Sequence, residues 1–170
     1  MLQMFIAIEI NLEPKENSLD MFQLFLQNLE ALKLPGIQYY LTLNNFDDCD
    51  DGDGIRYLKS VCKQLPHIDK LVCMKSLLHS HAFCELFRGL KLLIIKDSHI
   101  KFTPFAPGDL QQLIITNTII LSKSNSSTGD LKSLKSLVLQ DCKTNFKCLI
   151  TNNYNKSLIE TICLIDVEVR

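Results

Sequence analysis

The hexapeptide Leu90-Lys91-Leu92-Leu93-Ile94-Ile95 carries the pattern from which the architecture of this chain follows. It reads as an apolar residue, two others, an apolar residue, one other, and a final apolar residue. The same pattern returns as Leu110-Gln-Gln-Leu-Ile-Ile115 and as Leu134-Lys-Ser-Leu-Val-Leu139, with close variants at 68–73 and 159–164 and looser copies at 3–8 and 38–43. Such self-similarity along the chain predicts a repeat architecture.

The spacing of the copies narrows this prediction to one kind of repeat. The copies start at residues 3, 38, 68, 90, 110, 134 and 159, so the intervals are 35, 30, 22, 20, 24 and 25 residues. Leucine-rich repeats have periods of about 20–29 residues and the same leucine pattern. Over nearly its whole length the chain therefore resembles the leucine-rich-repeat family. Asn11 and Cys142 stand near the Asn/Cys turn position of that family, which most of the copies lack.

Alternation within each copy is typical of a strand with one buried face. Leu93 and Ile95 are expected to point inward, and Leu92, Ile94 and Lys96 outward. The copies predict parallel strands near residues 4–10, 39–44, 70–74, 92–96, 112–116, 136–140 and 161–165. The inward residues expected to be buried are Leu71, Leu93, Leu113, Leu137, Ile162, Ile95, Ile115 and Leu139.

The connections between the copies are expected to hold helices where they are long and turns where they are short. Apolar residues at helical spacing predict helices over 17–34 and 54–64, and a shorter one over 79–87. Segments 97–109, 122–133 and 142–157 are expected to be loops or single turns. The sequence thus predicts one α/β domain over 1–170, a horseshoe-shaped solenoid of about seven irregular repeats. Its parallel sheet is expected to be concave and its helices, turns and loops convex.

An ordinary α/β domain with a parallel sheet is the alternative fold, because buried parallel strands are also rich in Val, Ile and Leu. The connections after residue 90 argue against it, since a full crossover helix is hard to fit between 97 and 109.

Composition indicates a globular intracellular protein, cytoplasmic or nuclear. The hydrophobic share is 46%, and 18 basic residues nearly balance 19 acidic ones. That balance argues against a dedicated nucleic-acid binder. The odd number of cysteines, seven, at irregular spacing is not typical of a disulfide framework. We expect reduced thiols, no signal peptide and no membrane span.

Two clusters suggest metal sites, and neither has suitable spacing. The acidic loop of Asp47, Asp48, Asp50, Asp51 and Asp53 fits no register of a calcium-binding EF-hand, because Cys49 takes a ligand position. It is better interpreted as a solvated loop whose last acids favour the following helix N-terminus. His79, His81, Cys73 and Cys84 suit zinc by residue type but lack a compact ligand motif. We expect no metal and no cofactor, and the absence of nucleotide-binding or catalytic motifs predicts that the chain is not an enzyme.

The resemblance implies a protein-protein interaction module, the recognition or scaffold part of a larger assembly. A ubiquitin-ligase substrate receptor and an innate immune sensor are examples of such roles. The alternative is a scaffold subunit of a nucleic-acid-associated complex such as a kinetochore, using Lys70, Lys75, Lys91, Lys96 and Lys101. Steep loss of nucleic-acid binding with salt would indicate that alternative.

The outward residues of the strands are the expected binding surface. The central stripe is predicted to run through Ala7, Thr42, Val72, Ile94, Ile114, Val138 and Cys163. One flank is expected to hold Tyr40, Lys70, Leu92 and Gln112, and the other Met74, Lys96, Thr116 and Gln140. An apolar stripe with a polar margin is typical of an interface, although Val and Ile also favour strands without any partner. Cover by the loop 122–133 is a third possibility.

The ends of the array lack a recognisable polar cap, which solenoids need. We expect that the chain is a piece of a longer protein, or that another chain or a swapped element covers at least one end.

Overall fold

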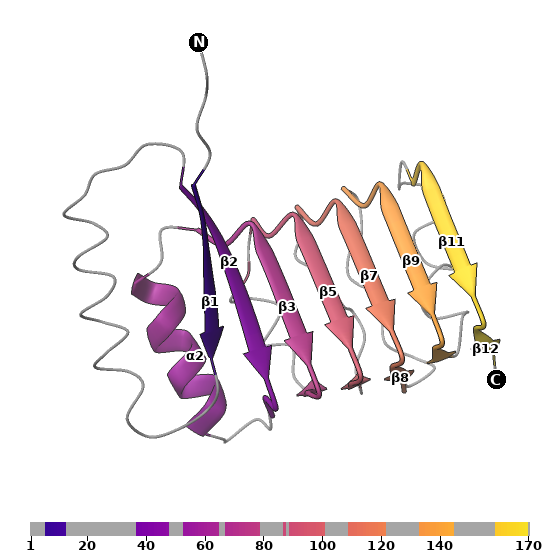
Figure 1. Cartoon of the computed structure of the whole chain (residues 1–170), viewed down its shortest axis with the longest axis horizontal. Coiled ribbons are helices and arrows are strands. Elements are labelled where there is room, and N and C mark those ends of the chain that lie inside the picture. Colours follow the sequence, from indigo (N-terminus) through magenta and orange to yellow (C-terminus); the bar gives the residue numbers. More distant parts are fainter. Residues whose placement is uncertain are drawn as a thin grey trace, which may run out of the picture.

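Seven parallel strands form one sheet in which spatial order equals sequence order (Figure 1). The computed structural model describes residues 6–12, 37–47, 53–64, 67–78, 87, 89–100, 109–121, 133–144 and 159–169. The strands are β1 (Ile6–Leu12), β2 (Ile37–Asn44), β3 (Lys70–Met74), β5 (Leu92–Lys96), β7 (Gln112–Thr116), β9 (Ser136–Gln140) and β11 (Thr161–Ile165). All seven predicted strands are confirmed. They lie side by side because the alternating apolar residues of each copy can be buried only against neighbouring copies.

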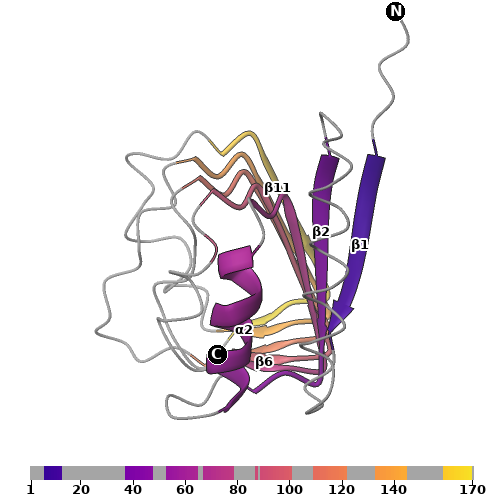
Figure 2. The same ribbon diagram turned by 90° about the vertical axis from the view of Figure 1, so that its left-hand side faces the viewer.

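A second parallel sheet was not predicted from the sequence. Its strands are only two residues long, namely β4 (Leu77–Leu78), β6 (His99–Ile100), β8 (Ile119–Ile120), β10 (Lys143–Thr144) and β12 (Glu168–Val169). They stack in the order β12-β10-β8-β6-β4, again following the sequence. Figure 2 shows this sheet leaving the lower edge of the main sheet at an angle. The expected loops 97–109 and 142–157 therefore contain strands β6 and β10.

One residue in the left-handed conformation follows each long strand from β2 to β11, at the turn toward the second sheet. The residues are Asn45, Lys75, Asp97, Asn117, Asp141 and Asp166, with φ between 47° and 53°. Five of the six are Asn or Asp, whose short polar side chains tolerate this conformation better than other non-glycine residues do. The turn redirects the chain from the long strand to the short one within two residues.

The helix α2 (Asp53–Gln64) confirms the helix predicted over 54–64. It lies on the same side of the main sheet as the second sheet (Figure 2). Leu58 on this helix is fully buried, and Cys62 packs against the core. The helix predicted over 17–34 and nearly all of the one predicted over 79–87 lie outside the described residues.

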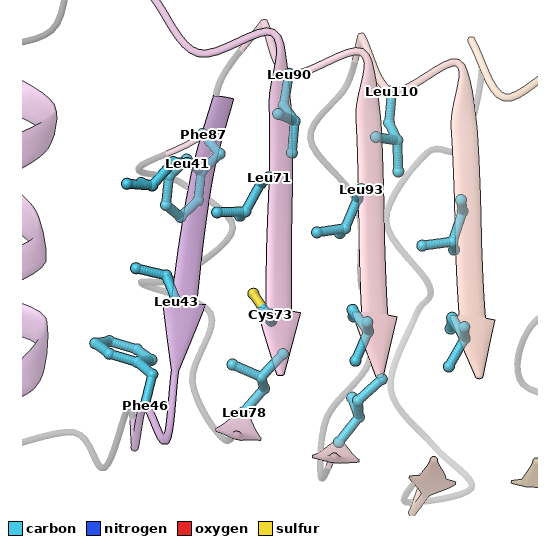
Figure 3. Packing of buried hydrophobic residues seen from close by; sticks show 14 of the residues in the cluster. Leu41, Leu43, Phe46, Leu71, Cys73, Leu78, Phe87, Leu90, Leu93 and Leu110 are labelled. Carbon is cyan, nitrogen blue, oxygen red and sulfur yellow. The ribbon is translucent and has the colours of Figure 1, made fainter. Parts of the chain in front are cut away.

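The core fills the angle between the two sheets. Two inward rows run across the strands, one of Leu41, Leu71, Leu93, Leu113 and Leu137, the other of Leu43, Cys73, Ile95, Ile115 and Leu139. Figure 3 shows the labelled side chains of these rows on the same side of the sheet. Burial of one such leucine or isoleucine contributes about 1.5–3 kcal/mol, so the rows form the main stabilising element of the described structure.

Two expectations are wrong in detail. Ile162 was expected to be buried, yet 42% of its surface is exposed, because among the described residues no strand lies beyond β11. Ala7 was expected beside Thr42, yet it pairs with Gln38, and Asn11 pairs with Thr42. The first copy matches the pattern poorly, so the pairing of β1 with β2 predicted from the sequence is shifted by four residues from the observed register.

The sequential order of both sheets is that of a repeat solenoid. In the alternative fold, helices would cross between neighbouring strands of a single sheet. Here β4, β6, β8 and β10 each follow a strand of the main sheet and stack in a sheet of their own. From β3 to the last described strand, the chain therefore winds as a coil with one long and one short strand per turn.

Candidate partner-binding face

The main sheet has an outer face, which we define as the side opposite α2 and the second sheet (Figure 2). Buried residues alternate with half-buried or exposed residues along β3, β5, β7 and β9. The buried ones belong to the core, so the others are the side chains of the outer face. Every residue that the sequence placed on this face from β3 to β9 is found there.

The central row of the outer face is apolar. Parallel pairing aligns Thr42, Val72, Ile94, Ile114, Val138 and Cys163 across six strands. Val72, Ile94, Ile114 and Val138 are half-buried, each packed between neighbours of the same row. Thr42 differs from them, since only 4% of its surface is exposed. From here on, the name central row is used for Val72, Ile94, Ile114 and Val138 only.

The two flanks of the central row are mostly polar, in the predicted order. Tyr40, Lys70, Leu92 and Gln112 align on one flank, and Met74, Lys96, Thr116 and Gln140 align on the other. The register adds residues that the sequence analysis did not name, namely Ser136 and Thr161 on the first flank and Asn44 and Ile165 on the second. They could have been found by continuing each row to the last copies.

Lysine supplies all of the charge on the outer face between β3 and β11. The outward positions of these five strands hold Lys70 and Lys96 and no carboxylate. The Lys70 ammonium lies 5.2 Å from the centre of the Tyr40 ring, a cation–π geometry. The Tyr40 hydroxyl donates a hydrogen bond of 2.8 Å to Gln38 Oε1, which fixes the ring. Lys70 is thereby held on the face while Lys96 is exposed.

A ladder of small polar side chains lies where the main sheet turns into the second sheet. It consists of Ser76, Ser98, Thr118 and Cys142, all buried. Each hydroxyl donates to the carbonyl two residues earlier, as Ser98 Oγ does to Lys96 O at 2.6 Å. Each hydroxyl also accepts a backbone N–H of the preceding repeat, from Phe46 at Ser76 Oγ and from the preceding rung at the other two, as Ser98 Oγ does from Ser76 N at 3.0 Å. The ladder thus satisfies buried backbone groups that the two sheets leave unpaired.

Sequence analysis missed this ladder except at Cys142. Each rung stands three residues after the second inward residue of its copy, as Ser98 follows Ile95. A hydroxyl stands at this position in three of the four rungs in place of the Asn or Cys of the family pattern, so the fixed spacing is the signal that could have identified them. Asn11, the other residue assigned to the turn position, instead lies within β1.

The thiols that pack in the core are poor nucleophiles. Burial raises the pKa of the Cys62 thiol to about 12. Burial also raises the pKa of the Cys142 thiol, opposed by its hydrogen bonds with the backbone of Thr118 and Gln140, while the nearby Asp141 carboxylate adds to the rise. The Cys142 sulfur lies 3.1 Å from Gln140 O and 3.3 Å from Ile115 O. Since only thiolates are reactive, these two cysteines serve packing and hydrogen bonding.

The two candidate metal clusters do not come together in the part of the chain that the structure describes. No group of three His, Cys, Asp or Glu side chains there is placed to hold an ion. Asp47 is exposed and Asp53 begins α2, while Asp48, Asp50 and Asp51 lie outside the described residues. Cys73 is buried in the core, and His79, His81 and Cys84 lie outside the description.

Of the five lysines of the alternative function, four lie among the described residues, and only two of these occupy outward positions of the main sheet. Lys70 and Lys96 lie on the outer face, Lys75 occupies a left-handed turn, and Lys91 precedes β5. Lys101 lies outside the described residues.

Within the described residues no helix has the length and apolarity of a membrane span. Comparison of the chain with protein-family models, with curated proteins and with solved structures finds no match.

Proposed function

We propose that this chain is an irregular leucine-rich-repeat solenoid that binds a protein partner through the outer face of its main sheet. The observation that carries the proposal is the central row, Val72, Ile94, Ile114 and Val138, which is apolar, in register across four strands and half-exposed. An apolar centre with a polar margin is the usual composition of a protein interface.

The ladder supports assignment to the leucine-rich-repeat family. With it, a complete copy reads Leu90-x-x-Leu93-x-Ile95-x-x-Ser98-x-Ile100, which matches the family pattern with a hydroxyl at the Asn/Cys position. The hydroxyl or thiol at that position bonds to the backbone of the neighbouring repeat, as the geometry of Ser76 and Ser98 demonstrates.

Free thiols favour a reducing compartment for this module. Cys62, Cys142 and Cys163 form no disulfide in the described part of the structure, as expected of an intracellular protein, cytoplasmic or nuclear. We assign no catalytic residue, since the outward positions from β3 to β11 hold apolar, hydroxyl, thiol and amide groups and two lysines, but no carboxylate or imidazole that could act as a general base. A recognition or scaffold part of a larger assembly, such as a ubiquitin-ligase receptor or an immune sensor, fits such a surface.

The experiment places a charge in the centre of the row. The double variant Ile94→Asp/Ile114→Asp should weaken partner binding on the order of 30-fold, since central apolar residues dominate interface energetics. The proteins retained by the tagged wild-type chain from its native cells are identified, and the double variant is then tested against the same proteins. The melting temperature should change little, because both side chains lie outside the core.

The matched control is Leu121→Asp, which changes an exposed apolar residue that follows β8 and belongs to neither face of the main sheet. It should leave binding unchanged. Equal binding by the folded double variant would show that the central row is not a binding site.

A further inference from the structure

The free edge of β11 differs from every inner strand of the main sheet. Among the described residues no strand pairs along this edge. Ile162 and Leu164 are 42% and 48% exposed, whereas their counterparts Leu137 and Leu139 on β9 are 2% and 0% exposed. The sequence pattern is the same in both strands, so the difference lies in the missing neighbour.

The backbone groups that face this edge follow from the parallel ladder. The N–H of Thr161 donates to Lys135 O at 3.0 Å, and Ile165 O accepts from Asp141 N at 2.9 Å. Residues 161, 163 and 165 therefore bond to β9, and the alternating residues Ile162 and Leu164 direct their N–H and C=O groups to the free edge. Glu160 O and Asp166 N complete the set, since their equivalents Gln111 O and Asp141 N are bonded to the next repeat.

Within β11 itself the edge has none of the usual protection against strand pairing, and the charged residues Glu160 and Asp166 only flank the strand. Natural edges carry lysines, prolines or bulges, but Thr161-Ile-Cys-Leu-Ile165 has no charged residue and no proline. Beside the exposed Thr161, it carries exposed apolar residues on both faces, with Ile162 and Leu164 on the inner face and Ile165 on the outer face. Such an edge is a template for another strand.

We propose that β11 pairs antiparallel with β11 of a second copy of this chain, with Cys163 at the centre. The four residues that face the edge, Glu160, Ile162, Leu164 and Asp166, are placed symmetrically about Cys163. In this register Ile162 forms a hydrogen-bonded pair with Leu164 of the second copy, and Glu160 forms one with Asp166 of the second copy. Each edge-facing backbone group thus finds a partner, and the exposed side chains of Ile162 and Leu164 cover each other.

Self-pairing is favoured over a head-to-tail stack. Parallel addition of a second copy through its β1 would leave a free β11 at the far end and generate an open filament. The antiparallel pair is closed by a two-fold axis and buries the exposed apolar residues of both edges at once. Its one unfavourable feature is the approach of Glu160 to Asp166 of the second copy. Salt screens this repulsion, so the dimer should strengthen as ionic strength rises.

Because Cys163 lies at the centre of the proposed pairing, disulfide cross-linking provides a second test of it. In this register Cys163 lies opposite Cys163 of the second copy at a non-hydrogen-bonded position, where the two Cα atoms lie about 4.5 Å apart. Disulfides span Cα distances of about 4.4–6.8 Å, and the Cys163 thiol is free and half-buried. Oxidation with copper(II)-phenanthroline and dissolved oxygen should therefore join the two Cys163 thiols and transfer their electrons to oxygen.

The test measures mass and cross-linking of the full chain. Light scattering in the presence of reductant should show the mass rising from 19.4 kDa to about twice that value as protein concentration increases. Leu164→Lys should keep the protein monomeric, while the matched control Leu121→Lys, which charges another exposed leucine away from the edge, should still dimerise. Oxidation should give a covalent dimer that Cys163→Ser abolishes.

Several outcomes would overturn the proposal. A wild-type mass that stays at one chain, growth beyond two chains, or a dimer that persists in Leu164→Lys each excludes β11 self-pairing. If Leu164→Lys loses its circular-dichroism signal, that variant is unfolded, and cross-linking of the wild-type chain then tests whether β11 pairs with itself. A covalent dimer that persists in Cys163→Ser contradicts the proposed register. None of these outcomes bears on the central row, so the proposed function is tested separately.

Discussion

Strands β9 and β11 carry nearly the same sequence pattern, yet they have opposite environments. Leu137-Val-Leu139 and Ile162-Cys-Leu164 both place apolar residues at the inward positions. The first pair is buried between β7 and the following repeat, and the second is exposed, because β11 has a described neighbour on one side only. In a solenoid, burial is a property of the neighbours that a repeat has, since each repeat contacts only those beside it.

The largest expected effect on stability is the difference between truncating an inward residue of an inner strand and truncating the equivalent residue of the edge strand β11. Leu113→Ala should destabilise the fold by about 2–5 kcal/mol, because the cavity lies in a fully packed row. Ile162→Ala should cost about 1 kcal/mol or less, since its side chain already contacts water. Urea denaturation at low protein concentration, where association does not contribute, measures both. Equal losses would mean that β11 is packed as β9 is.

The ladder offers the next largest effect. Ser98→Ala should cost about 1–3 kcal/mol, because it leaves the buried N–H of Ser76 without its acceptor. Ser98→Thr is the matched control and should be nearly neutral, as Thr118 occupies the same position in the next repeat. Both values come from chemical denaturation. A neutral Ser98→Ala would show that water replaces the hydroxyl.

The turn at Lys75 should be stabilised by replacing the lysine with Asn, a residue that occurs at the equivalent turns of other repeats. Lys75 adopts φ 52°, whereas five of the six equivalent turns hold Asn or Asp. Lys75→Asn should raise stability by about 1 kcal/mol, since Asn tolerates the left-handed region better. Lys91→Asn, at an exposed position outside the left-handed turns, is the control and should bring no gain. Thermal unfolding followed by circular dichroism compares the two, and equal shifts would contradict the backbone argument.

The smallest effect concerns a hydroxyl on β10 of the second sheet. Thr144 is buried, and its Oγ1 has no hydrogen-bond partner in the described structure. Thr144→Val should therefore stabilise the protein by at most about 1 kcal/mol, because it removes a desolvated polar group at constant shape. Thr118→Val should destabilise it, since that hydroxyl donates to Thr116 O at 2.8 Å. A loss in both variants would mean that the Thr144 hydroxyl is bonded in solution.

Much of the candidate face was predictable because strand periodicity fixes faces. Once Leu93 and Ile95 are assigned inward, Ile94 and Lys96 must lie outward, and the repeat aligns them with Ile114 and Thr116. The exception is β1, where a loose copy of the pattern leaves several registers equally plausible. Only pairing with β2 placed Asn11, and not Ala7, beside Thr42.

The sequence alone determined where the strands lie and which residues turn inward, since both follow from local spacing of apolar residues. Tertiary structure decided the second sheet, because its two-residue strands are too short to carry a periodic signal and form only when stacked. It also decided the role of Ser76, Ser98 and Thr118, whose hydroxyls acquire partners only from the adjacent repeat. The exposure of Ile162 and Leu164 has the same cause, since a residue is buried only when another part of the structure covers it.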